Sequence, residues 1–205
     1  MLTQLVVGAQ RGNAADIKTA RGGKDLDLIA SEYQPKYYSQ VLDGRVFSAL
    51  GTLTSPVIYS TAAGTGGPLL WNSSTTVNIV VISVGIDVTT ASGVAGSIGL
   101  TGGFQGTSAP GSTTAIDAGP KNMLLGGPAS SITAYRKGTV ANAGGFYIPL
   151  FNVSTGAVSI NTGWTYTDVG GIIVVPPQYY VSVATSATLT SMVSNIGLQW
   201  VEVPL

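Results

Sequence analysis

Apolar and polar residues alternate most regularly over residues 77–88. From residue 80 onward the even positions are all apolar and β-branched, and they are Val80, Ile82, Val84, Ile86 and Val88. The odd positions become polar along the same stretch, at Ser83 and Asp87. Because successive side chains of a β-strand point to opposite faces of the sheet, this pattern predicts a long strand with its even positions on a core.

A second alternating stretch closes the chain, over residues 194–203. Ile196, Leu198 and Trp200 share one face, whereas Asn195 and Gln199 fall on the other. We expect a final strand with the aromatic and aliphatic set buried. The sequence Glu202-Val203-Pro204 suits its end, since proline cannot donate a hydrogen bond to a neighbouring strand.

Further short strands are predicted between turn signals. They cover residues 45–50, 56–60, 69–72, 97–105, 123–125, 132–135, 146–152, 157–160, 171–175 and 179–185. The Asp43-Gly44 pair favours a tight turn, and Pro176-Pro177 should interrupt pairing. Many short strands separated by turns predict an all-β fold, an antiparallel β-sandwich or barrel. Much of 93–119 is rich in glycine, serine and threonine and is interpreted as loop, while 25–31 is the one stretch that allows a short helix.

The composition restricts the chemistry. The 205 residues include no cysteine and no histidine, which excludes disulfides, thiolate metal sites, cysteine nucleophiles and imidazole bases. We therefore expect no catalytic, cofactor-binding or metal-binding residues and no enzymatic activity.

Only 9% of residues are charged, against about 25% in a typical soluble domain. The formal net charge is zero, which favours association into a multi-subunit setting. The alternative is a neutral, polar monomer.

The charges gather at the start of the chain, where residues 1–50 hold 11 of the 18. This shift predicts an extended N-terminal arm over 1–32 and a β-sandwich domain over 33–205. The candidate docking residues of the arm are Arg11, Lys18, Arg21, Lys24, Tyr33 and Tyr37. Acidic residues such as Asp16 and Asp25 offset the cations, so a nucleic-acid partner is not expected.

No apolar run is long enough for a membrane span. A secretory signal is not expected either, because the apolar patch near the start of the chain precedes the first basic residue.

Two residue classes deserve a functional interpretation. The acids of the β-rich part are Asp87, Asp117, Asp168 and Glu202, and a glycosidase needs two carboxylates about 5 to 9.5 Å apart. The spacing of these acids in the sequence does not predict that two of them meet in space, and turn or edge positions are favoured for them.

Tyrosines at 33, 37 and 38 and at 179 and 180 are candidate platforms for a sugar or a partner, although core packing is favoured. At most one of Tyr179 and Tyr180 should be free, because neighbours in a strand face opposite ways.

Three segments together resemble a known family. They are Tyr37-Tyr38 followed by Gly44-Arg45-Val46-Phe47, then Leu70-Trp71-Asn72, then Gln199-Trp200-Val201-Glu202-Val203-Pro204. Over residues 33–205 the chain resembles small structural proteins of tailed-bacteriophage virions, which often have a W-E-E-V-P-like terminus; Val201 stands here for the first Glu. The resemblance implies a jelly-roll-like sandwich, often trimeric, that decorates a capsid or forms part of a head fibre or tail.

Three hypotheses follow. The first is a non-enzymatic virion component, assembled in the host cytoplasm, whose partners are its own copies (a trimer preferred) and the major capsid protein or other virion subunits. The second is a receptor- or glycan-binding head of a fibre or tail, with its ligand on loops 93–119 and 141–145. The third is a carboxylate hydrolase that uses Asp87 or Asp168.

Overall fold

The computed structural model describes residues 21–22, 28–29, 37–54, 58–60, 67–90, 92–116, 118–154, 164–189 and 191–205. The chain divides into two compact units, Met1–Tyr38 and Ser39–Leu205. In the first unit, β1 (Arg21–Gly22) and β2 (Leu28–Ile29) pair antiparallel. The helix expected over 25–31 is therefore wrong at Leu28 and Ile29. An isolated helix of that length is unstable in water, and the backbone of these residues is satisfied by strand pairing instead.

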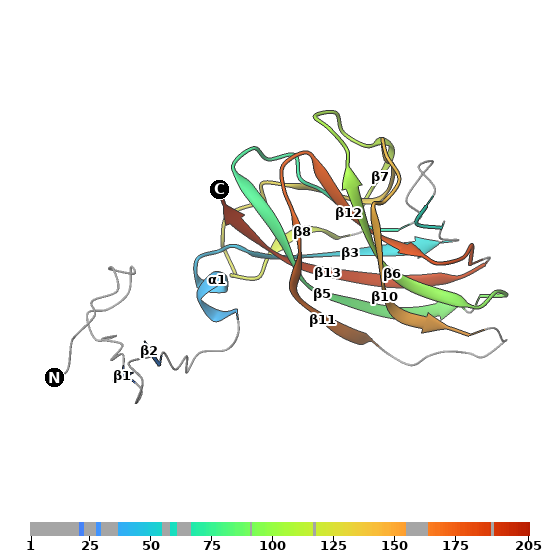
Figure 1. The fold of residues 1–205 in the computed structure, drawn as a ribbon, viewed down its shortest axis with the longest axis horizontal. Coiled ribbons are helices and arrows are strands. Elements are labelled where there is room, and N and C mark those ends of the chain that lie inside the picture. Colours follow the sequence, from blue (N-terminus) through green and yellow to red (C-terminus); the bar gives the residue numbers. More distant parts are fainter. Residues whose placement is uncertain are drawn as a thin grey trace. The chain divides into compact units, whose positions relative to one another are not determined.

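The second unit contains two antiparallel sheets (Figure 1). The first sheet has the order β11 (Thr165–Val175), β5 (Val77–Thr90), β13 (Val193–Pro204), β3 (Val46–Thr54) and β8 (Ala118–Asn122). The second has the order β10 (Phe146–Val153), β6 (Gly96–Phe104), β12 (Tyr179–Thr185), β4 (Leu69–Trp71), β9 (Thr133–Thr139) and β7 (Gly111–Ala115). The predicted antiparallel β-sandwich is confirmed.

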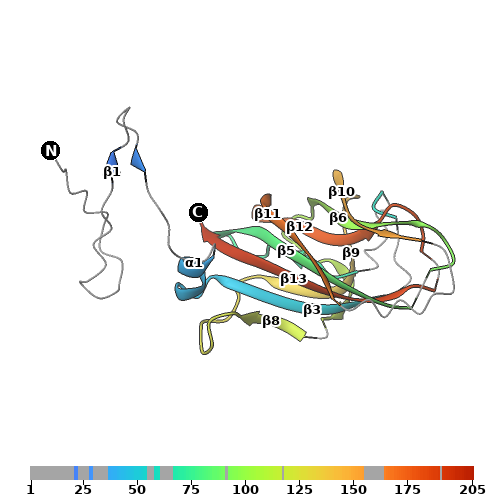
Figure 2. The same cartoon turned by 90° about the horizontal axis from the view of Figure 1, so that it is seen from below.

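The strand order is that of a jelly roll. Apart from the inserted β7, β8 and β9, successive strands alternate between the sheets except at β6 and β10, which are neighbours in the second sheet. β3, β5, β11 and β13 thus form one layer, and β4, β6, β10 and β12 form the other (Figure 2). Eight strands connected in this way make the two Greek keys of a jelly roll. The insertion between β6 and β10 extends both sheets, with β8 beside β3 and β9 beside β4.

The core lies between the two layers, and β13 supplies its centre. Ile196, Leu198 and Trp200 are all buried, as their alternation predicts. Trp200 has no exposed surface and stacks on Phe47 of β3, with ring centroids 6.0 Å apart. The second sheet completes the same core with Leu70, Leu100, Val181 and Val183.

The periodicity of β5 is broken by a bulge. Trp200 of β13 pairs with Val81, and Gln199 pairs with Ser83, so Ile82 has no partner in β13. An extra residue in one strand reverses the facing of every residue beyond it. This single insertion divides β5 into two halves. Odd-numbered residues face the core before Ile82, and even-numbered residues face it after Ile82.

The expectation for β5 is consequently only half right. Val84 and Ile86 lie in the core beyond the bulge, as predicted. Before the bulge the odd positions Ile79 and Val81 are the buried ones, each without exposed surface. The prediction is wrong for Val80, which is half-buried and lies outside the core cluster.

Two other expectations are corrected. The strand expected over 97–105 is confirmed as β6, but the loop interpretation of the rest of 93–119 is wrong at β7 and the start of β8. Residues 123–125 form a turn instead of a strand, and Leu125 is 96% exposed. The strand lies just before them because Lys121 and Asn122 pair with β3. The strand expected over 157–160 falls outside the described residues. Of the strand expected over 56–60, the structure describes 58–60, where Ile58 makes a bridge to Thr185.

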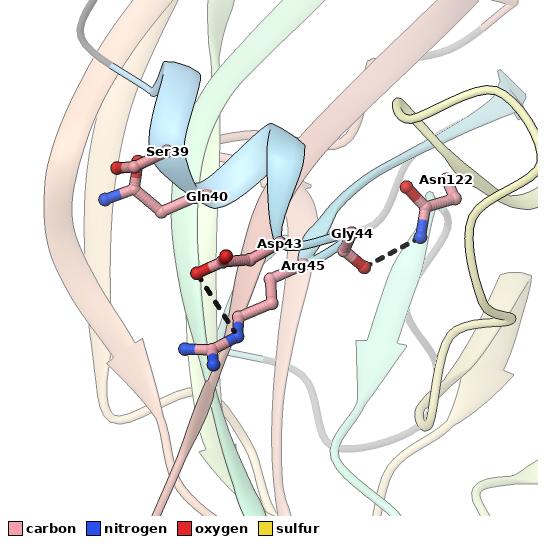
Figure 3. Close-up of polar contacts among 6 residues, drawn as sticks. All are labelled: Ser39, Gln40, Asp43, Gly44, Arg45 and Asn122. Carbon is pink, nitrogen blue, oxygen red and sulfur yellow. Dashed lines mark hydrogen bonds and ion pairs between the residues drawn. The ribbon is translucent and has the colours of Figure 1, made fainter. Parts of the chain in front are cut away.

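A short helix, α1 (Tyr38–Leu42), precedes β3 and was not predicted. The expected turn at Asp43-Gly44 is confirmed, since Gly44 has a φ of 68°, a conformation that glycine adopts freely. Figure 3 shows how this turn is held: Asn122 Nδ2 donates to the Gly44 carbonyl at 2.7 Å. Arg45 Nε lies 4.0 Å from Asp43 Oδ2, an exposed pair that adds little stability. The β8 end thus anchors the start of β3.

Asn72 joins four strand ends at one corner of the sandwich. Its side-chain amide donates to the carbonyls of Val77 and Val175, at 2.9 Å each, and the residue is 1% exposed. Its backbone bonds to Gln178 and Tyr179, just after the Pro176-Pro177 interruption between β11 and β12. Both amide hydrogens are therefore committed to hydrogen bonds within the fold.

The outer face of the second sheet has a smaller core of its own. Tyr180 is 2% exposed and packs with Leu69, Trp71 and Val140. Its hydroxyl donates to the Asn142 carbonyl at 2.8 Å. Burial raises the pKa of Tyr180 to about 12 because the anionic form would lose its hydration.

This shift predicts a loss of stability at high pH. Between pH 10 and pH 12 the unfolded chain deprotonates at residue 180 while the folded chain keeps the proton, so the free energy of unfolding falls by up to about 3 kcal/mol as pH rises. The Tyr180→Phe variant is expected to show a shallower decline over this interval. Urea unfolding at pH 9 and pH 11.5 measures both slopes, and equal slopes in the two proteins would contradict the assignment.

Candidate functional site

The outer face of the first sheet carries a polar row that crosses all five strands. Its members are opposite one another in register, and they are Asp168, Ser83, Gln199, Ser48 and Lys121. The neighbours of Gln199 in β13, Leu198 and Trp200, are core residues, so the row faces away from the sandwich interior. Ser83 Oγ donates to Gln199 Oε1 at 2.8 Å, which fixes the centre of the row.

The next row along the sheet has glycine at its two central positions. Tyr166 of β11 pairs with Gly85, which pairs with Gly197, which in turn pairs with Leu50. The missing side chains leave room for the Tyr166 ring to lie over the backbone. A Cβ built on Gly85 would come within 2.5 Å of that ring.

Trp164 and Tyr166 form an aromatic pair on this glycine floor. Their ring centroids are 5.9 Å apart with an interplanar angle of 22°. The Trp164 ring reaches to 3.6 Å from where a Gly197 Cβ would stand. Tyr166 is nevertheless 60% exposed and Trp164 41% exposed. Each ring therefore rests on the sheet and still offers apolar surface to solvent.

These rows enclose a shallow groove of about 350 Å³, here called the outer-face groove. Its described lining consists of Ser48, Ala49, Leu50, Gly119, Lys121, Trp164, Tyr166, Gly197, Leu198 and Gln199. Hydroxyl and amide groups lie on one side and aromatic rings at the β11 end. Within this described lining, Lys121 is the one charged residue. Such a combination of apolar faces with a few directed polar groups is typical of small-ligand sites.

Among the candidate carboxylates that the structure describes, Asp87 and Asp168 do not converge. Asp168 lies in register with Ser83, and Asp87 is four residues further along β5, roughly 13 Å away at the rise of a strand. Asp87 accepts from Asn195 Nδ2 at 3.4 Å, and Asp168 accepts from the Gly170 amide at 2.7 Å, as turn and edge acids do. The expected separation of these acids is confirmed.

Glu202 has a structural position instead. It is 7% exposed, and its carboxylate accepts hydrogen bonds from Ser130 Oγ at 2.6 Å and from the hydroxyl and amide of Ser131. These bonds tie the turn before β9 to β13. Asp117 lies outside the described residues. Across the part of the chain that the structure describes, no three acidic, histidine or cysteine side chains gather into a metal-binding group.

The predicted docking arm lies mostly beyond what the structure describes. Arg21 belongs to β1, and Tyr37 directly precedes α1. Arg11, Lys18, Lys24 and Tyr33 are outside the described residues. The docking role of all six stays a prediction. No helix in the described residues is long and apolar enough to cross a bilayer.

The tyrosine expectation is confirmed at 179 and 180. Tyr180 is buried, whereas Tyr179 is 40% exposed and meets Phe104 edge-on, with ring centroids 5.2 Å apart. The expected ligand loop 141–145 is held on the second sheet. Ala141 donates to Gln105 Oε1 and Asn142 Nδ2 donates to the Phe104 carbonyl, both at 2.9 Å.

The sequence did contain a signal for the groove that our predictions did not use. Trp164 and Tyr166 are two residues apart, a spacing that places both on one face of a strand. Gly85 and Gly197 interrupt two otherwise apolar strands, which marks a close approach of another group to the backbone. Only the register shows that the glycines lie beneath the aromatics.

Comparisons with known proteins find similarity only at the level of solved structures. No protein-family model matches the chain, and no curated protein matches its sequence. One similar solved structure is described as "KBV activated particle at acidic pH". The similarity covers the whole of this chain and 85% of that one, at 8% identity and a TM-score of 0.34. The jelly-roll assignment stands on the strand order alone. The fold defines the chain as a jelly-roll protein, with an open groove on the outer face of its first sheet.

Proposed function

We propose that this chain is a non-enzymatic structural component of a tailed-phage virion that decorates or attaches to the capsid through protein–protein contacts. Jelly rolls recur in viral capsid proteins and in lectins. The fold is therefore compatible with a structural role and with a binding role, and it does not decide between them. The low charge of the chain supports a subunit that works among close neighbours. The separated carboxylates support a role without bond-making chemistry.

The exposed edge of β11 is the observation that carries this proposal. β11 ends the first sheet, so one side of its backbone has no partner strand among the described residues. Ile172 is 74% exposed and Val174 is 55% exposed on this strand, while Asp168 is its one charged residue. Proteins usually protect such edges with charges, prolines or a covering segment. A neighbouring subunit would bury this edge, which supports a homo-oligomer, with a trimer preferred.

A reconstitution experiment tests the proposal. Virions that lack this protein are mixed with the purified full-length chain and separated on a density gradient. The proposal predicts that the chain migrates with the particles in a fixed copy number, as a contact-built component of the virion. Recovery of all the protein at the top of the gradient, under conditions where the particles are intact, would refute virion attachment.

A second candidate function is favoured by the outer-face groove. A receptor- or glycan-binding head of a fibre or tail needs an exposed recognition surface, and Trp164 with Tyr166 provides one. This function is compatible with attachment to a particle, because the groove and the β11 edge use different side chains. The residues that line the groove do not include Ile172 or Val174.

A further inference from the structure

We propose that the outer-face groove binds a neutral saccharide, with a sugar ring stacked on Trp164 and Tyr166 and its hydroxyls bonded by the polar row. This inference rests on the second candidate function and specifies its site and ligand class. It is independent of virion attachment, which the gradient experiment tests separately.

The aromatic pair is fixed in a ligand-ready orientation. The absence of a side chain at Gly85 lets the Tyr166 ring lie against the sheet, and Trp164 lies near Gly197 in the adjacent strand. A ring held in this way loses little conformational freedom when a ligand stacks on it. The C–H face of a pyranose is flat and apolar, so it complements the solvent-facing side of such a ring.

The polar row supplies the other half of a saccharide site. Serine hydroxyls and the glutamine amide each donate and accept hydrogen bonds, as sugar hydroxyls do. Ser48 and Gln199 line the groove, and the bond from Ser83 Oγ to Gln199 Oε1 orients the amide. That orientation commits the amide oxygen to Ser83 and leaves the NH₂ group as the donor toward a ligand.

The charges around the groove favour a neutral ligand. Asp168 continues the polar row beyond Ser83, and Asp87 lies in the row on the other side of Gly85. Both acids flank the aromatic end, where they would repel a carboxylate or a phosphate. Lys121 stands at the opposite end of the row, on β8. A nucleic acid would need a stripe of cations that this face lacks in its described residues.

A glycan array with purified full-length protein tests the site. Wild-type protein is expected to bind neutral saccharides saturably. Tyr166→Ala removes the platform and Gly85→Ala displaces it by placing a methyl group where the ring lies, so each should weaken binding at least about tenfold. Tyr166→Phe keeps the stacking face and should retain most of the affinity. Tyr179→Ala, an exposed aromatic on the other sheet, is the matched control and should bind like wild type.

The outcomes separate the two levels of the proposal. If wild type binds saccharides but Tyr166→Ala and Gly85→Ala bind equally well, the groove is the wrong site while a glycan-binding head survives. If wild type binds nothing on the array, the glycan-binding function itself fails. Exclusive binding of acidic saccharides would overturn the neutral ligand class. A Gln199→Ala variant provides a second test, since loss of the donor should weaken binding without altering the aromatic pair.

Discussion

Replacing Trp200 by alanine is expected to lower the free energy of unfolding by about 3–5 kcal/mol, which would remove much of the stability of a domain of this size. Trp200 lies in β13, the central strand of the first sheet, and has no exposed surface. Its ring stacks on Phe47 and contacts the core from both layers. Truncation leaves a cavity that the surrounding strands cannot close without losing their register.

Trp164→Ala provides the matched control. It removes the same side chain from a site that is 41% exposed, and we expect a loss of less than about 1 kcal/mol. Chemical denaturation of both variants, followed by far-UV circular dichroism, measures the difference. Equal destabilisation by the two substitutions would contradict the placement of Trp200 in the core.

Deleting residues 1–32 is expected to abolish attachment to the particle while the body stays folded. Every strand of the two sandwich sheets lies within Ser39–Leu205, so the deletion removes none of these strands. An arm that orders on contact adds affinity through a second attachment point. The density-gradient assay should therefore find the truncated chain unbound, at a level more than about tenfold below the full-length chain.

A charge variant distinguishes the cations of the arm from its mere length. Replacing Arg11, Lys18, Arg21 and Lys24 by glutamine keeps the length of the arm and removes its cations, so attachment should weaken and lose its salt dependence. Thermal unfolding of the truncated chain should match that of the full-length protein. Full incorporation of the truncated chain would refute the docking role.

The sequence was informative where alternation runs without interruption. Ile196, Leu198 and Trp200 were correctly placed in the core because β13 follows a regular period of two along that face. In β5 the same reasoning held after Ile82 and failed before it, since the bulge at Ile82 depends on pairing with β13. The apolar pattern within one strand does not show where pairing with a neighbouring strand will place a bulge.

The glycine-rich stretch 93–119 was predicted only in part. The strand expected over 97–105 is β6, where the missing side chains of Gly99 and Gly102 let β10 and β12 approach closely. The expectation of loop failed for β7 and the start of β8, which form strands by pairing with β9 and β3. The outer-face groove was likewise hidden, because Trp164 and Gly197 are far apart in sequence and meet only through the jelly-roll order. Strand pairing over long sequence separations therefore determines the site, and local propensity does not contain it.

The β11 strand joins the two proposed functions in one element. Its first half carries Tyr166 on the groove, and its second half exposes Ile172 and Val174 at the sheet edge. The bulge between Asp168 and Ile173 separates these halves, with Gly170 and Gly171 both at positive φ. One strand can thus present a ligand surface and a subunit contact without either using the residues of the other.

Electron microscopy of purified virions labelled with antibodies against this chain tests the central claim most directly. If the jelly-roll body acts by shape and contact as a virion subunit, gold label will decorate intact particles at regular positions on the capsid, a fibre or the tail. Label that is absent from intact particles, with the protein found only in the lysate of the infected host, would contradict the account.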